Sequence, residues 1–80
     1  MVDKIGYTKE EVEELQMLDR LVNKFSAEMK KKIFATFDAG WRGGWDDRAN
    51  KERMKLKILG NASKGDMVDV ANYAAFIWNM

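Results

Sequence analysis

Cysteine and histidine are both absent from this chain of 80 residues. Their absence excludes a disulfide framework, and it excludes zinc sites built from thiolate or imidazole ligands. It also excludes nucleophilic catalysis by a Ser-His-Asp or Cys-His arrangement. The chemistry that remains belongs to carboxylates, lysines, tyrosines and a bound hard cation. We therefore expect any catalysis by this chain to depend on a metal ion.

Proline is absent as well, and no run of about 20 apolar residues occurs. The N-terminus lacks the basic segment, the apolar segment and the small residues of a secretory signal. These absences predict a protein without a membrane partner that acts in the cytoplasm. The formal net charge of +1 argues against a protein that coats nucleic acid, and we expect no DNA partner.

The length of the chain allows one domain, covering residues 1–80. A chain this short buries only about 60–65% of the surface that its unfolded state exposes, so the core of a single copy is marginal. Because disulfides and zinc are excluded, association with further copies is the remaining means of stabilising it. We therefore expect a homo-oligomer, either a dimer or a tetramer.

A helical pattern runs through the chain, in which 46% of the residues are hydrophobic. Thr8 and Glu11 form a capping-box signature, which predicts a first helix over residues 9–38. Ser26 is an alternative N-cap, so a break of this helix near Phe25 stays open. A stripe this long is expected to contact another chain as well as the later helices. The stripe consists of Val12, Leu15, Leu18, Val22, Phe25, Met29, Ile33 and Phe37.

Two shorter helices are predicted after a glycine-rich loop at residues 40–47. The first covers about 48–59, with Gly60-Asn61 as its C-cap. The second is capped by Ser63 or Asp66 and runs close to the C-terminus, with almost no polar face. The expected fold is all-α, with a long N-terminal helix plus two shorter helices in an oligomeric helical bundle. The stripe and the last helix would be buried between subunits.

Asp66 and Asp69 are the candidate metal ligands, because residues three apart share a helix face and can aim two carboxylates at one cation. Asp66 has an alternative role as the N-cap of the last helix. Asp69 lies among apolar neighbours and needs a partner, for which Lys64 or Arg42 is the alternative to a metal. Asn72, one turn further on, is expected either to bind a ligand or to satisfy an interhelical hydrogen bond.

Trp41 and Trp45 flank Arg42 in the loop. Indole faces stack on bases and Arg binds phosphate through two parallel hydrogen bonds, so this trio is a candidate nucleotide site. In the alternative interpretation the two indoles fold over the end of the helical bundle and contribute apolar area.

Basic residues dominate the segment 42–64, where seven cations stand against three carboxylates. An anionic ligand would be drawn to this segment. Lys55 and Lys64 are therefore predicted anion contacts alongside Arg42. The separate run Lys30-Lys31-Lys32 is typical of a solvated surface, with phosphate contact across an oligomer interface as its alternative.

Three segments together resemble one known family: Met29-Lys30-Lys31-Lys32-Ile33 on the long helix, Gly40-Trp41-Arg42-Gly43-Gly44-Trp45, and Asp69-Val70-Ala71-Asn72-Tyr73-Ala74. They are similar to the small MazG-like proteins encoded by bacteriophages, over roughly residues 20–80. The resemblance implies the all-α fold of the nucleoside triphosphate pyrophosphohydrolases. It also implies Mg²⁺ held by a Glu-x-x-Glu pair on one helix and a Glu-x-x-Asp pair on the next.

The metal motif of that family is only half present. Asp66-x-x-Asp69 matches the second pair, with Asp in place of Glu. At the expected place of the first pair, Glu52 is followed three residues later by Lys55, and that helix holds no other carboxylate pair. The resemblance therefore implies the scaffold of the family with an incomplete site for Mg²⁺.

These observations predict a nucleotide-binding, catalytically inactive MazG-like phage protein. It would sequester a nucleotide, such as a host signalling nucleotide, in the cytoplasm of an infected bacterium. Trp41 or Trp45 would stack on the base, and Arg42, Lys55 and Lys64 would contact phosphates. One alternative is a Mg²⁺-dependent nucleoside triphosphate pyrophosphohydrolase. The other is an interaction module that binds and inhibits a host protein.

Overall fold

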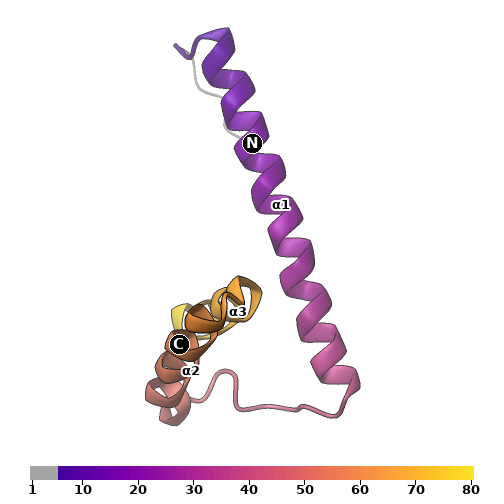
Figure 1. Ribbon diagram of the computed structural model, residues 1–80, viewed down its shortest axis with the longest axis vertical. Helices are drawn as coiled ribbons and strands as arrows, with labels where there is room; N and C mark the ends of the chain where they lie inside the picture. Colours follow the sequence, from indigo (N-terminus) through magenta and orange to yellow (C-terminus); the bar gives the residue numbers. More distant parts are fainter. Residues whose placement is uncertain (1–5) are drawn as a thin grey trace.

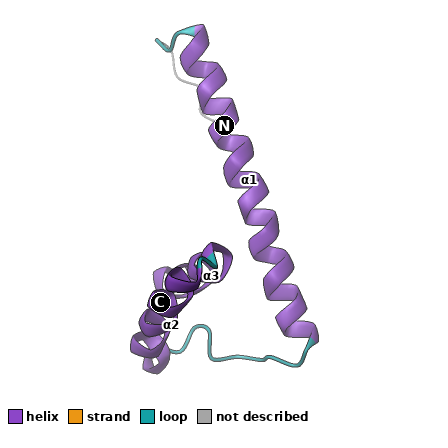
Figure 2. Ribbon diagram, viewed as in Figure 1, coloured by secondary structure: helices purple, strands orange, loops and turns teal. Residues whose placement is uncertain are grey.

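The computed structural model describes residues 6–80, and within that range every regular element is a helix. In chain order these are α1 (Lys9–Asp38), the short 3₁₀ helix η1 (Arg48–Asn50), α2 (Lys51–Lys64) and α3 (Met67–Asn79). Figure 1 shows α1 as a long rod joined by an extended loop to the hairpin of α2 and α3, and Figure 2 shows the same chain by secondary structure. The expected all-α fold, with one long helix and two shorter ones, is confirmed.

The first helix has the predicted limits and is unbroken at Ser26. Its start is a complete capping box. The Glu11 N–H donates to Thr8 Oγ1 over 3.1 Å, and the Thr8 N–H donates to Glu11 Oε1 over 3.0 Å. Because both contacts lie within one turn, the local sequence is sufficient to start this helix.

The predicted end of the second helix is wrong. The helix α2 continues through Gly60 and Asn61 and ends at Lys64. Gly65 follows in the left-handed conformation, with φ of 81°, and the N–H groups of Gly65 and Asp66 bond to carbonyls of the last turn. Gly60 is an interior residue of α2, because the chain reverses at Gly65 and not at Gly60. The predicted start at residue 48 is the 3₁₀ helix, so α2 proper begins three residues later.

Asp66 is the N-cap of α3, as one of the two interpretations predicted. Its Oδ1 accepts the Asp69 N–H over 3.0 Å. Ser63, the other predicted cap, lies within α2. The cap and the left-handed Gly65 together reverse the chain, so that α2 and α3 pack side by side.

The helix α3 lies between α2 and the C-terminal part of α1. Met54 of α2 is 4% exposed and is the one buried apolar residue in the described range, and Asn72 of α3 is 5% exposed. The N-terminal part of α1 extends past the hairpin (Figure 1). Of the described helices, none is long and apolar enough to cross a membrane.

Candidate ligand-binding site

A cavity of about 290 Å³ lies where α1, α2, α3 and the glycine-rich loop meet. This volume is near the lower end of the range found for small-molecule sites, which begins at about 300 Å³. Each of the three helices contributes at least one charged side chain to the lining. Its basic residues are Lys32, Arg53 and Lys57, and its aromatic residues are Trp41, Tyr73 and Phe76.

The basic side chains converge on the cavity from two helices. Arg53 and Lys57 are four residues apart on α2, so they share one face of that helix, while Lys32 comes from α1. Asp69 of α3 is the only carboxylate in the lining, and its Oδ1 lies 3.9 Å from Lys32 Nζ. Three cations against one carboxylate leave the cavity with an excess of positive charge, which attracts an anion.

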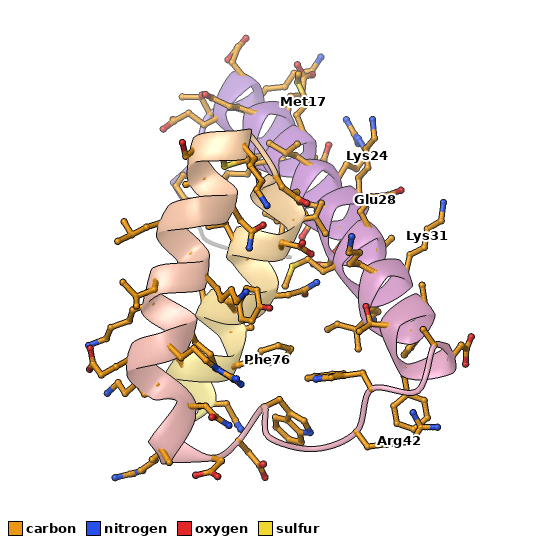
Figure 3. All side chains as sticks on the ribbon, turned by 60° about the horizontal axis from the view of Figure 1, so that its bottom comes forward. Met17, Lys24, Glu28, Lys31, Arg42 and Phe76 are labelled. Carbon is orange, nitrogen blue, oxygen red and sulfur yellow. The ribbon has the colours of Figure 1, made fainter. Side chains whose placement is uncertain are left out.

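The aromatic side chains form a cluster around Phe76, which Figure 3 labels. The Trp41 ring stacks on Phe76 with centroids 5.9 Å apart, and Tyr73 meets Phe76 edge-on at 6.0 Å. Trp45 contacts the same ring at 6.3 Å but does not line the cavity. Both indoles therefore pack over the end of the bundle, and Trp41 and Tyr73 also present surface to a ligand.

The loop backbone can approach the cavity because glycines form its wall. Gly43 and Gly44 line the cavity and have φ values of 65° and 82°, which other residues rarely adopt. The Gly44 carbonyl accepts the Asn50 side-chain amide over 2.9 Å, and a Cβ at Gly44 would lie 3.3 Å from that amide nitrogen. This contact ties the loop to the start of α2.

Asn72 is the buried polar residue of the cavity wall. Its Nδ2 donates to the Met29 carbonyl of α1 over 3.2 Å, so the interhelical hydrogen bond expected from the sequence is present. Its Oδ1 has no hydrogen-bond partner among the described residues. A buried acceptor without a donor costs about 1–3 kcal/mol.

Asp69 is held near Lys32 rather than near the predicted partners Lys64 or Arg42. Partial burial raises the pKa of Asp69, and the ammonium group of Lys32 opposes that rise. Asp66 raises the pKa further, and Lys64 adds a weaker opposing attraction. Lys32 was not among the predicted partners, because α3 packs its Asp69 face on α1 and the local sequence does not specify that contact.

Asp66 and Asp69, the predicted metal ligands, each have a partner within the protein. The Asp66 carboxylate is engaged as the cap of α3, and Asp69 lies beside a lysine ammonium group. Residues 6–80 hold no group of three or more side chains suited to ligating a metal. Because one or two carboxylates with water and substrate phosphates can hold Mg²⁺, binding of Mg²⁺ by this pair stays a prediction.

Four of the predicted ligand residues lie outside the cavity, namely Arg42, Trp45, Lys55 and Lys64. Arg42 stacks its guanidinium 3.5 Å from the centroid of the Phe37 ring and donates to the Phe37 and Trp41 carbonyls. Figure 3 shows it at the end of α1, away from Phe76. Lys55 Nζ lies 3.0 Å from Glu52 Oε1, and Lys64 borders a neighbouring open depression. Of the predicted site residues, the structure brings Trp41, Asn72 and Asp69 together.

Arg53, Lys57, Tyr73 and Phe76 are among the cavity residues that were not predicted from the sequence. The four-residue spacing of Arg53 and Lys57 was the available signal, since it places two cations on one helix face. Comparison with known proteins gave no match to a family model, to a curated protein or to a solved structure. The similarity to MazG-like proteins therefore stays an expectation that rests on the three sequence segments alone.

Proposed function

We propose that this protein binds a nucleotide in the cavity between its three helices and holds it without converting it. The observation that carries the proposal is the convergence of Lys32, Arg53 and Lys57 with an aromatic wall in one small cavity. A nucleotide combines the two chemistries that this lining favours, a phosphate and a flat ring.

Each part of the lining has a role in this proposal. The three cations contact the phosphate, and Arg53 is suited to two parallel hydrogen bonds with its oxygens. Trp41 and Tyr73 contact the base. Phe76 packs against the rings of Trp41 and Tyr73 and holds them in position. Asn72 holds α3 against α1 beside this site through its hydrogen bond to the Met29 carbonyl. In a phage, such a protein would withdraw a host signalling nucleotide from circulation.

The test incubates the purified protein with a panel of linear and cyclic nucleotides, with and without Mg²⁺. Retained and released species are then identified by mass spectrometry. We expect an unaltered nucleotide to be retained. The Arg53→Gln, Lys57→Gln double variant is expected to bind it at least tenfold more weakly, because hydrogen bonds to charged groups contribute about 1.5–3 kcal/mol each.

A matched control lies on the same helix. Lys51 and Lys55 are exposed basic residues of α2 outside the cavity, and the Lys51→Gln, Lys55→Gln variant removes the same formal charge. It is expected to retain most of the affinity. Equal loss in both variants would indicate attraction by overall charge and would contradict binding in the cavity.

The other outcomes of this experiment identify the alternative functions. Release of a monophosphate with pyrophosphate, abolished by Asp69→Ala, would indicate a pyrophosphohydrolase. If nothing were retained or converted, the interaction module would be favoured. In that case Trp41→Ala and Trp45→Ala are expected to disrupt capture of a host protein.

A further inference from the structure

The helix α1 exposes apolar side chains on both its halves. Their exposed fractions lie between 39% and 63%, which is high for large apolar residues at helical spacing. Five of them lie in the first half, which extends past the α2–α3 hairpin (Figure 1). The full set is Val12, Met17, Leu18, Leu21, Val22, Phe34 and Phe37.

The chain exposes more surface than a compact monomer of the same mass. Its accessible surface is 6532 Å², whereas a compact monomer of this mass exposes roughly 5,000 Å². Its radius of gyration is 16.2 Å, compared with about 12 Å for a compact chain of this length. The excess is larger than the roughly 800 Å² that each partner buries in a stable interface. The missing core can therefore be supplied by a second copy.

Charge along α1 indicates how that copy is oriented. Residues 9–19 contain five carboxylates against Lys9, and residues 20–32 contain five cations against Glu28. Figure 3 shows Lys24, Glu28 and Lys31 pointing away from α2 and α3, where a partner can reach them. Two parallel helices would place like charges together, whereas two antiparallel helices place each acidic segment beside the partner's basic segment.

We propose that α1 pairs with α1 of a second copy in an antiparallel arrangement, related by a two-fold axis. The exposed apolar residues in the first half of each α1 then face Phe34 and Phe37 in the second half of the partner's α1. The acidic segment of each helix lies beside the basic segment of the other. Such an interface is self-complementary, as two-fold symmetry requires. This inference does not depend on nucleotide binding, because it rests on a surface outside the cavity.

The apolar part is tested by sedimentation velocity over a range of protein concentrations. The wild-type chain is expected to sediment as a dimer, or as a larger assembly built from such pairs. The Leu18→Glu, Leu21→Glu variant is expected to sediment as a monomer. Leu56→Glu is the matched control, since Leu56 is 68% exposed on α2. A monomeric wild type, or dissociation caused by Leu56→Glu alone, would overturn the proposal.

The orientation is tested by reversing charge, which leaves the apolar face intact. In the antiparallel pair, Glu13→Lys, Glu14→Lys would place two lysines beside the partner's Lys30 and Lys31. Lys30→Glu, Lys31→Glu would place two carboxylates beside the partner's Glu13 and Glu14. Each variant alone is expected to self-associate at least tenfold more weakly at low salt, and an equimolar mixture is expected to recover wild-type affinity. Unchanged self-association of the separate variants would indicate parallel helices and refute the antiparallel pair. Lys51→Glu, Lys55→Glu on α2 is the control for overall charge.

Discussion

At the scale of single residues, Asp69 and Asn72 lie on one face of α3 and make two different polar contacts with α1. Asn72 joins α3 to α1 through the Met29 carbonyl, and its Oδ1 is buried without a hydrogen-bond partner among the described residues. Asp69, one turn earlier, lies beside Lys32 on the same side. Burial disfavours the charged form of Asp69 and raises its pKa, and the ammonium group of Lys32 opposes part of this rise.

Replacing Lys32 with Gln is expected to raise the pKa of Asp69 further, because Lys32 is the largest influence that lowers it. A carboxyl group with a raised pKa binds its proton more readily in the folded state. Its contribution to stability therefore falls as the pH rises through that pKa, and the fall should be larger in Lys32→Gln. A carbon-13 NMR titration of the Asp69 carboxyl group measures the shift.

The control for this titration is Lys64→Gln. Lys64 also lowers the pKa of Asp69, but it is the smallest of the influences acting on that group. Its removal should therefore move the titration less than removal of Lys32. A larger movement in Lys64→Gln would contradict the packing of Asp69 against α1.

At the scale of the helices, two glycines five positions apart have opposite roles. Gly60 is a helical residue of α2, and a Cβ there would meet nothing within 4 Å. Gly65 ends the helix at a φ of 81°, where a side chain is strained even in open space. The two sites therefore provide a matched pair for testing where α2 ends.

Gly60→Ala is expected to stabilise the fold by about 0.5–1 kcal/mol, since alanine favours the helix and restricts the unfolded chain. Gly65→Ala is expected to destabilise it by about 1–2 kcal/mol, the cost of a left-handed conformation. Urea unfolding followed by circular dichroism, at one protein concentration, measures both. Destabilisation by Gly60→Ala would instead favour a helix that ends at Gly60.

At the scale of the whole molecule, the described residues bury little apolar surface within one copy, with Met54 as the single buried apolar side chain among them. The hairpin of α2 and α3 covers only part of a helix that is 30 residues long. The antiparallel pair proposed above would give the uncovered part a partner. Stability would then be linked to association.

The melting temperature is accordingly expected to rise with protein concentration, because only the folded chain associates. Differential scanning calorimetry over about a hundredfold range of protein concentration would measure this dependence of the melting temperature. The Leu18→Glu, Leu21→Glu variant should melt at a lower temperature that does not vary with concentration. A wild-type melting temperature independent of concentration would contradict the linkage.

The features that could be predicted from the sequence are those whose partners are close along the chain. The limits of α1 follow from its apolar spacing and from a capping box made within one turn. The start of α3 follows from Asp66, whose carboxylate reaches an N–H only three residues away. The end of α2 was mispredicted because Gly60 and Gly65 have the same local signal, and the difference lies in which of them reverses the chain.

The composition of the cavity depends on packing between helices. Lys32 meets Asp69, and Met29 meets Asn72 across 43 residues of sequence, only because α3 lies against α1. The cations of α2 join them since the turn at Gly65 folds that helix beside α3. Arg42 instead lies on Phe37, close by in the chain. Hydrogen bonds between residues close in sequence thus determine where the helices begin and end. Contacts between residues far apart in sequence determine which charged side chains line the same cavity.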